Sequence, residues 1–309
     1  MSLTSFLKNK EVKEAFRREF KKPRSTLRAQ LLAPPLTNHY GLVGTAFDYL
    51  LRFYVKRLNP DAIEKRWISE TSLHLLLSAQ FYNLFGTPAK QPFKQQLIEM
   101  FIRNPLLSDN RVFKKVSEII KFAKNAYHKF IETGKMELNI FKAALLLAQV
   151  DLIYRVGIVD ENLGRVDEND IADLQNLISI VKPEYFKANK VCILNPTFGK
   201  ASSLVGGADC DLVIDDTIIE VKTTKRLKFV RDYFDQLVGY YILYQIGGID
   251  GLPEGVQIKR LGVYFSRYAY LHYINVEDVI KQETFWPFVE WFKKQAIEKY
   301  GTFVDYTDR

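Results

Sequence analysis

Three residues between positions 206 and 222 could do metal chemistry: Asp211, Glu220 and Lys222. The segments on either side of residues 215 and 216 are rich in Val and Ile, which predicts two strands joined by a tight turn. Because side chains alternate between the faces of a strand, Glu220 and Lys222 share a face. On the other strand, Asp209 and Asp211 share a face as well. The sequence therefore predicts carboxylates and one ammonium on one side of an otherwise apolar hairpin.

Two carboxylates, with the backbone carbonyl of Val221 between Glu220 and Lys222, form a set of hard oxygen ligands suited to Mg²⁺ or Mn²⁺. Beside them, Lys222 could hold or polarise a water molecule, or balance charge that grows on a phosphoryl group. Such a site could hydrolyse phosphodiester bonds. The alternative is an ordinary solvated strand face, on which Glu and Lys commonly alternate.

The elements that must position these residues follow from hydrophobic periodicity and from the places of Gly and Pro. After Pro183, short runs rich in β-branched and aromatic residues predict strands over 190–194, 208–214, 217–223, 258–266 and 268–276. One helix is predicted between them, over 229–245, and a last one over 276–300, in which Pro287 should start a new segment or make a kink. Before Pro183 the chain is predicted to be helical over 3–20, 41–58, 68–84, 92–102, 108–133, 137–157 and 170–181.

This order predicts a mixed α/β fold, of the α+β kind, in three sections. Residues 1–59 form basic N-terminal helices, 60–183 an all-helical section, and 184–309 the part that carries the sheet. Residues 1–30 hold nine Lys or Arg and three Glu. Two interpretations of this segment stay open: a solvated helix face, or an arm that contacts phosphates.

Length and composition limit the classes of function. With 309 residues, 47% of them hydrophobic and 26% charged, the chain can bury a full core and is neither collagen-like nor disordered. Its net charge of +8 favours a polyanionic partner. Two cysteines, Cys192 and Cys210, cannot supply a four-cysteine metal site. The sequence shows no secretory signal and no run of 18 apolar residues, so we expect a cytoplasmic protein without a membrane partner.

The spacing of Asp211, Glu220 and Lys222 resembles the D-x8-E-x-K core of the PD-(D/E)xK nuclease superfamily. Two further matches resemble its RecB-like branch. Gln236-Leu-Val-Gly-Tyr240 resembles the Q-x3-Y motif, and the stretch 44–48, Gly-Thr-Ala-Phe-Asp, has the spacing of the G-T-x-x-H motif with Asp48 in place of His. The alternative is that Gly-Thr caps a helix and that the tyrosine is one more core aromatic.

The resemblance implies a restriction-endonuclease-like fold, in which a central mixed sheet is flanked by helices and carries a large all-helical insertion. It implies that Asp211 bridges the metal ions and that Glu220 coordinates one of them together with the Val221 carbonyl. Lys222 would orient the attacking water. Asp209 is the reserve candidate for the bridging position, because a register error in D-x-D exchanges the two aspartates.

The resemblance also assigns roles outside the hairpin. Asp48 would take the position of the family's metal-binding histidine, and Gln236 and Tyr240 would organise the site and touch the nucleic-acid strand. The cations that follow the second strand would meet the phosphate backbone. These residues are Lys225, Arg226, Lys228 and Arg231.

We therefore expect an Mg²⁺- or Mn²⁺-dependent deoxyribonuclease of repair, recombination or phage defence, with DNA rather than RNA as substrate. An iron–sulfur cluster and a nucleotide cofactor are not expected, since the chain lacks the four cysteines and the G-x-x-x-x-G-K-[ST] loop. Such an enzyme would stand alone or borrow a motor or defence partner. Two alternatives stay open: a catalytically silent relative that uses the nuclease fold to bind DNA or protein, and a helical scaffold in which E-V-K is accidental.

Overall fold

The computed structural model describes residues 2–85 and 104–300. The described residues form two compact units. The sheet unit comprises the described parts of Met1–Leu32, Leu58–Lys65 and Lys182–Arg309, and the helical unit comprises those of Ala33–Arg57 and Arg66–Val181. The helix predicted over 92–102 lies outside the described residues.

Within the described residues, six strands of the sheet unit form one mixed sheet in the order β1-β2-β3-β4-β5-β6. Strand β1 is parallel to β2 and β4 is parallel to β5, whereas the remaining neighbours are antiparallel. The strands are β1 (Ile63–Glu64), β2 (Cys192–Leu194), β3 (Leu212–Ile214), β4 (Thr217–Lys222), β5 (Arg260–Phe265) and β6 (Tyr270–Asn275). The mixed α/β fold class is thereby confirmed.

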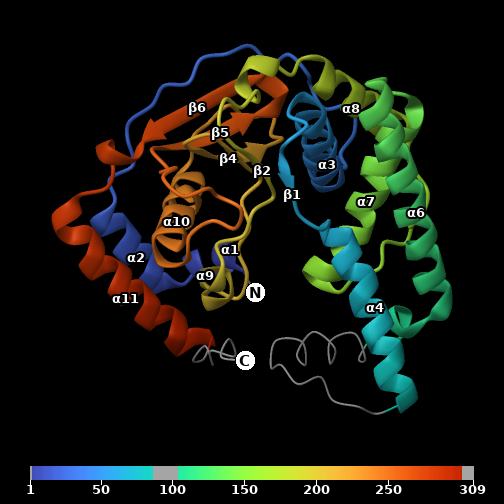
Figure 1. The fold of residues 1–309 in the computed structure, drawn as a ribbon, viewed down its shortest axis with the longest axis horizontal. Coiled ribbons are helices and arrows are strands. Elements are labelled where there is room, and N and C mark those ends of the chain that lie inside the picture. The colour runs from blue at the N-terminus through green and yellow to red at the C-terminus, as the bar shows by residue number, and fades with distance from the viewer. Residues whose placement is uncertain (1, 86–103, 301–309) are drawn as a thin grey trace. The chain divides into compact units, whose positions relative to one another are not determined.

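Helix α10 (Arg231–Gly247) makes the crossover between the parallel strands β4 and β5 and packs against both of them (Figure 1). The short helices α1 (Leu3–Leu7) and α2 (Lys10–Glu19) and the last helix α11 (Gln282–Tyr300) complete the core on this side of the sheet. Helix α1 contacts α10, and α2 contacts α11. The N-terminal helices are thus part of the core that supports α10.

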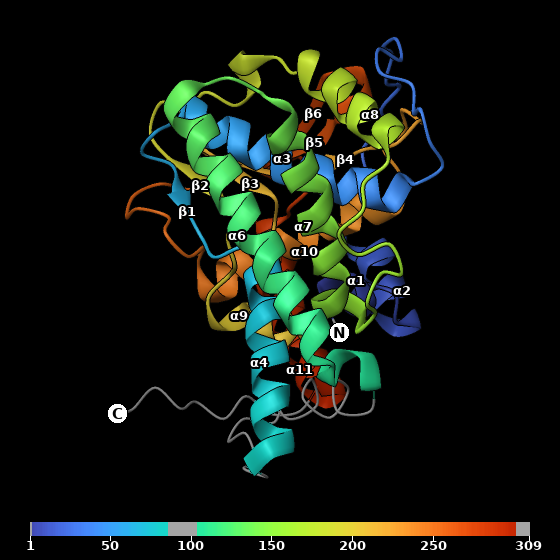
Figure 2. The ribbon, with the colours of Figure 1, turned by 90° about the vertical axis from the view of Figure 1, so that its right-hand side faces the viewer.

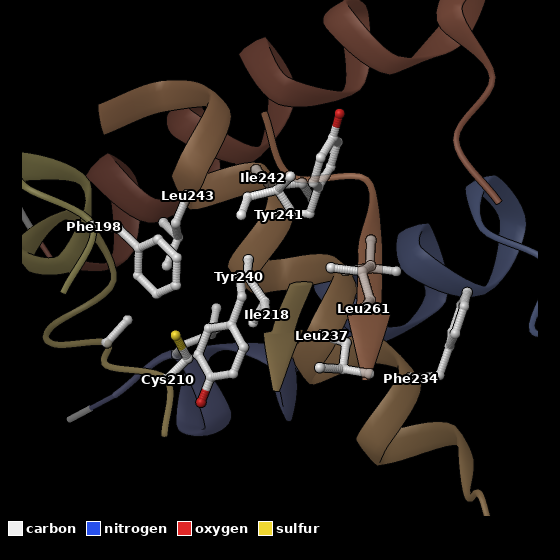
Figure 3. Packing of buried hydrophobic residues seen from close by; sticks show 14 of the residues in the cluster. Phe198, Cys210, Ile218, Phe234, Leu237, Tyr240, Tyr241, Ile242, Leu243 and Leu261 are labelled. Atoms are coloured by element: carbon white, nitrogen blue, oxygen red, sulfur yellow. The ribbon is translucent and has the colours of Figure 1, made fainter. Parts of the chain in front are cut away.

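The core between these helices is aromatic. The ring of Phe6 packs edge-on against Phe292 at 5.1 Å, and Phe16 packs in the same way against Phe288 at 5.3 Å, each distance joining ring centroids. A Cβ atom at Gly239 would stand 3.1 Å from the Leu3 side chain, so the glycine allows α1 to approach α10 closely. Figure 3 shows the apolar side chains that α10 adds to this core.

The described part of the helical unit consists of α3 (Tyr40–Leu58), α4 (Ile68–Phe85), α6 (Asn110–Thr133), α7 (Leu138–Val156) and α8 (Glu168–Ser179), with a short 3₁₀ turn at Pro105–Ser108. Helix α7 packs against α4, α6 and α8, and Figure 2 shows α4, α6 and α7 side by side. Because its neighbours cover it on several sides, α7 is apolar along most of its length.

Several predicted elements differ from the structure. The segment 3–20 is two helices, because Asn9 caps α2 by accepting hydrogen bonds from the backbone N–H groups of Glu11 and Val12. The strand predicted over 208–214 begins only at Leu212, after glycines 206 and 207 with positive φ angles. The two-residue strand β1 was not predicted. The helix predicted over 276–300 starts at Gln282, and no new segment starts at Pro287.

The division into units also differs from the three predicted sections. The predicted boundary near 183 lies next to the start of the last stretch of the sheet unit, at Lys182. The predicted section 1–59 is shared, since residues 1–32 belong to the sheet unit and 33–57 to the helical unit. The reason is packing: α1 packs on α10 and α2 on α11, while the rings of Tyr49 and Phe53 on α3 contact Trp67 of the helical unit.

Candidate active site

The end of β4 and the first turns of α10 share a closed network of hydrogen bonds. The ammonium of Lys222 donates to Glu220 Oε1 at 2.7 Å and to Gln236 Oε1 at 3.1 Å. The Gln236 amide in turn donates to Glu220 Oε1 at 3.0 Å and to the Tyr240 hydroxyl at 2.8 Å. The Tyr240 hydroxyl donates to Glu220 Oε2 at 3.1 Å. Four predicted site residues therefore hold one another in place.

Secondary structure explains why these four side chains meet. Glu220 and Lys222 are two residues apart on β4 and share its α10 face, while Gln236 and Tyr240 are four apart and share one face of α10. The Tyr240 ring also stacks on Phe198, with centroids 5.3 Å apart and 18° between the ring planes (Figure 3). Only 7% of Glu220 is exposed. The Q-x3-Y residues are thus partners of the buried carboxylate as well as members of the core.

Asp211 reaches the same strand from β3's side. Its Oδ2 atom accepts a hydrogen bond of 2.6 Å from the backbone N–H of Val221. Since Leu212 pairs with Ile219 across the hairpin, Asp211 stands next to the end of β4 that carries Glu220. The predicted hairpin with its turn at residues 215 and 216 is confirmed.

The prediction that Asp209 and Asp211 alternate within a strand is wrong, because both precede β3. Asp209 instead forms an isolated antiparallel bridge with Thr197. The carboxylate of Asp211 is placed by its own hydrogen bond to β4 rather than by strand pleating. This contact holds Asp211 against β4.

Three nearby carboxylates affect the pKa values of other groups in the site. Burial, followed by the negative charges of Glu220, Asp211 and Asp209, raises the pKa of the Tyr240 hydroxyl well above its ordinary value. Burial and these same three charges raise the pKa of the Cys210 thiol. Tyr240 is therefore a neutral hydrogen-bond donor at neutral pH, as its contact with Glu220 requires.

Lys222 is the cation of this network. Burial alone would lower the pKa of its ammonium, but the charge and hydrogen bond of Glu220, and then the charge of Asp211, raise it above the ordinary value. The side chain is therefore protonated at neutral pH. One lysine charge stands among three carboxylates, so the neighbourhood as a whole is acidic.

The donor chemistry of this site fits a divalent cation of the Mg²⁺ or Mn²⁺ type. The side-chain ligands would be the carboxylates of Asp211 and Glu220. The Val221 residue follows Glu220 in the chain, and its backbone N–H donates to Asp211. In the part of the chain that the structure describes, no three His, Cys, Asp or Glu side chains are arranged to hold a metal ion. A cation here would therefore need the backbone carbonyl as a third ligand.

Asp48, the residue that stands in place of the family's histidine, belongs to the helical unit. It lies on α3, where its Oδ2 accepts a hydrogen bond from Arg52 one turn later, at 2.9 Å. Its other carboxylate oxygen, Oδ1, is buried without a hydrogen-bond partner. The predicted role of Asp48 as a metal ligand stays a prediction.

The cations predicted to meet nucleic acid divide into two kinds. Lys225, Arg226 and Lys228 are exposed in the loop between β4 and α10. Arg231 is instead engaged within the protein: it forms an ion pair with Asp235 at 2.7 Å and donates to the backbone carbonyls of α2 and the residue after it. Its guanidinium fastens α2 to α10.

Sequence reasoning missed Tyr233, whose ring lies below the Lys222 ammonium, 5.0 Å from nitrogen to ring centroid. It also missed Phe198, the stacking partner of Tyr240. For Tyr233 a signal existed, since it stands three residues before Gln236 and therefore shares the same face of α10. For Phe198 there was none, because it lies in a loop whose path the sequence does not define.

Comparisons with protein-family models, with curated proteins and with solved structures found no match for this chain. Among the described helices, none is both long enough and apolar enough to cross a membrane. The function must therefore be inferred from the residues of the site and their geometry.

Proposed function

We propose that this protein is a metal-dependent nuclease that hydrolyses phosphodiester bonds of DNA. The observation that carries the proposal is the closed network of Glu220, Lys222, Gln236 and Tyr240, with Asp211 hydrogen-bonded to the same strand. The residues of the D-x8-E-x-K and Q-x3-Y patterns were selected from the sequence, by their types and spacing and by the family resemblance. Accidental matches would not be expected to converge on one buried carboxylate.

The topology supports the same proposal. An antiparallel hairpin that carries the acidic residues is followed by a crossover helix and a parallel strand, after which a further antiparallel strand closes the sheet. This arrangement is what a restriction-endonuclease-like core would require. On this view the large insertion is residues 60–183, most of which belong to the helical unit, and the enzyme would act in the cytoplasm in repair, recombination or phage defence, alone or with a motor or defence partner.

In the proposed reaction, different residues of the site would bind the metal ion, orient the water and position the carboxylate. Asp211, Glu220 and the Val221 carbonyl would hold a divalent cation, which when bound supplies Lewis-acid stabilisation and lowers the pKa of water. Lys222, protonated and fixed by Glu220 and Gln236, is placed to orient the attacking water or to balance charge on the phosphoryl oxygens. Tyr240 holds the second oxygen of Glu220 and so limits the rotation of that carboxylate.

The test is cleavage of labelled single-stranded and duplex DNA in Mg²⁺ or Mn²⁺, with the wild type compared with Glu220→Ala and Lys222→Ala. We expect the wild type to cut at least one substrate and each variant to lose about 100-fold or more in rate. Lys293→Ala, which removes an exposed ion pair on α11, serves as the control and should cut like the wild type. Equal cleavage by the variants would contradict the assignment.

The alternative is a catalytically silent module with the same fold. In the structure both oxygens of Glu220 already have partners within the protein, an arrangement that a purely structural carboxylate would also show. A wild type that binds DNA but cuts no substrate with either metal would favour this alternative.

A further inference from the structure

Two basic segments that are far apart in the sequence meet on the sheet unit beside the candidate active site. The ammonium of Lys22 lies over the ring of Phe229, 5.0 Å from its centroid. Nearby, the guanidinium of Arg231 donates to the backbone carbonyls of Phe16 at 2.8 Å and Phe20 at 2.9 Å. The chain that leaves α2 is therefore held against the loop that follows Lys222 on β4.

The charges at this meeting point repel one another. Burial, then the positive charges of Arg231 and Lys228, lower the pKa of Lys22. Burial, followed by the charge of Lys22, also lowers the pKa of His272, whose ring packs on Phe229 at 4.9 Å between centroids. Cations from both segments are thus close enough to affect one another.

Internal carboxylates do not fully balance these charges. Asp235 pairs with Arg231, but within the described residues neither Lys22 nor Lys228 forms an ion pair. Lys22 donates to the backbone carbonyl of Pro23, at 3.2 Å. A bound anion would relieve the repulsion between the two lysines.

The N-terminal segment after α2 is fixed by its apolar residues and exposes its cations. Leu27 and Leu31 pack on the core of the sheet unit, and the N–H of Leu32 donates to the carbonyl of Arg267 at 2.9 Å. Lys21, Arg24 and Arg28 are exposed along the same stretch. The loop between β4 and α10 is fixed similarly, because the Tyr268 hydroxyl donates to the Lys225 carbonyl at 2.7 Å.

We propose that these two segments form one surface that binds the phosphate backbone of a nucleic-acid strand. This basic surface consists of Lys21, Lys22, Arg24, Lys225, Arg226 and Lys228. The proposal rests on the proposed function for the identity of the anion, since the loop runs directly from Lys222, where phosphodiester cleavage would occur. The ammonium and guanidinium groups of this surface would contact phosphate oxygens and so position the strand. This surface also decides between the two interpretations of residues 1–30: the phosphate-contacting part is the extended segment after α2.

Binding can be measured apart from cleavage. Fluorescence anisotropy of labelled single-stranded and duplex DNA is recorded in EDTA, with Glu220→Gln as the background, over a series of KCl concentrations. In this background, Lys22→Ala with Lys228→Ala should raise Kd about tenfold and reduce the slope of log Kd against log salt by roughly 1.4 to 1.8, as expected for two lost phosphate contacts. A second pair, Lys22→Gln with Lys228→Gln, keeps side-chain length and should behave alike.

The control pair is Lys187→Ala with Lys294→Ala, which removes the same charge from exposed positions elsewhere on the sheet unit. Its Kd and salt slope should match those of the background, and the thermal midpoint of every variant checks folding. Unchanged binding in both lysine pairs, equal losses in the control pair, or no DNA binding at all would overturn the proposal. Competition by polyglutamate as strong as by unlabelled DNA would also overturn it, in favour of an acidic protein partner.

The results separate this inference from the proposed function. Salt-dependent DNA binding that needs Lys22 and Lys228, in a protein that cuts nothing with either metal, would leave the surface standing and reject the nuclease. Metal-dependent cleavage together with unchanged binding in the lysine variants would support the nuclease and reject the basic surface.

Discussion

Each unit of the molecule buries one carboxylate that accepts a hydrogen bond from a tyrosine, and the two differ in how the charge is balanced. In the sheet unit, Tyr240 donates to Glu220 at 3.1 Å, and Lys222 stands 2.7 Å from the same carboxylate. In the helical unit, Tyr49 donates to Asp151 at 2.6 Å, but the nearest basic nitrogen of Arg155 is 3.6 Å away. The first carboxylate has a hydrogen-bonded cation and the second does not.

This difference affects the pKa values of Asp151 and Lys222. Burial raises the pKa of Asp151 to about 6, although Arg155, Tyr49 and Arg52 act in the opposite direction. Its Oδ2 atom is buried without a hydrogen bond. In the sheet unit, Glu220 instead helps to raise the pKa of Lys222. The Tyr49–Asp151 pair is thus a contact between two helices. In the sheet unit, Lys222 and Gln236 are added to the tyrosine–carboxylate pair and hold a positive charge beside Glu220.

The largest effect is expected when the buried carboxylate of the sheet unit, Glu220, loses its cation and so resembles Asp151. Lys222→Met removes the cation and leaves Glu220 buried without it, so the free energy of unfolding should fall by about 3 kcal/mol and cleavage by about 100-fold or more. Adding Glu220→Gln should restore most of the stability but no activity. Urea titration of the two single variants and the double variant measures the coupling. Additive losses would show that the two side chains are not coupled.

The second effect concerns the carboxylate without a close cation. Because the folded-state pKa of Asp151 is raised from 3.8 to about 6, the folded protein binds this proton more tightly than the unfolded chain. Its contribution is fully present below pH 4 and is lost as the pH rises through 6. Relative to Asp151→Asn, the wild type should lose about 2 kcal/mol of unfolding free energy between pH 4 and pH 6. Parallel pH curves for the two proteins would contradict the raised pKa.

The two tyrosines provide a matched pair of smaller changes. Tyr49→Phe takes the hydroxyl from Asp151 and Ser69 and should cost about 1 to 2 kcal/mol of unfolding free energy without changing the rate of cleavage. Tyr240→Phe should cost about 1 kcal/mol or less, since Glu220 keeps Lys222 and Gln236, yet it should lower the cleavage rate about tenfold. A rate loss in Tyr49→Phe, with none in Tyr240→Phe, would reverse the assigned roles.

The last comparison concerns Asp48, whose largely buried ion pair with Arg52 joins successive turns of α3. Asp48→Asn keeps an oxygen that can accept the Arg52 hydrogen bond but removes the negative charge paired with the buried guanidinium, so the unfolding free energy should fall by about 1 to 2 kcal/mol. The family resemblance nevertheless implies a large loss of cleavage. If this variant cleaves DNA as fast as the wild type, Asp48 is not part of the active site, while the assignment of the residues on β4 and α10 is unchanged.

The sequence predicted the long helices and the hairpin well, because their signals are local. Strand β4 and helix α10 lie within two residues of their predicted bounds, and so does α3. Strand β1 has only two residues and is defined by its pairing with β2, more than a hundred residues later, so no local pattern marks it. The start of β3 was predicted too early because the residues before Leu212 form only an isolated bridge, between Asp209 and Thr197, and not a continuous ladder.

For the site, strand alternation predicted that Glu220 and Lys222 share a face, and the family resemblance added Gln236 and Tyr240, which lie one helical turn apart. Strand alternation does not explain the place of Asp211, whose carboxylate is held by a hydrogen bond from the Val221 backbone N–H. Arg231 shows a limit of charge patterns, because its guanidinium is engaged with Asp235 and the end of α2. Nothing local in the sequence distinguishes it from the exposed Lys228.

The central claim is tested most directly by single-turnover cleavage of labelled DNA by Asp211→Asn over a series of Mn²⁺ concentrations. The amide oxygen of asparagine can still accept the Val221 N–H, so the fold should be kept and the thermal midpoint should stay near that of the wild type. We predict a wild-type rate that rises with Mn²⁺ to saturation and a variant rate about 100-fold lower at every concentration. A variant that cleaves as fast as the wild type, with the same dependence on Mn²⁺, would contradict the claim.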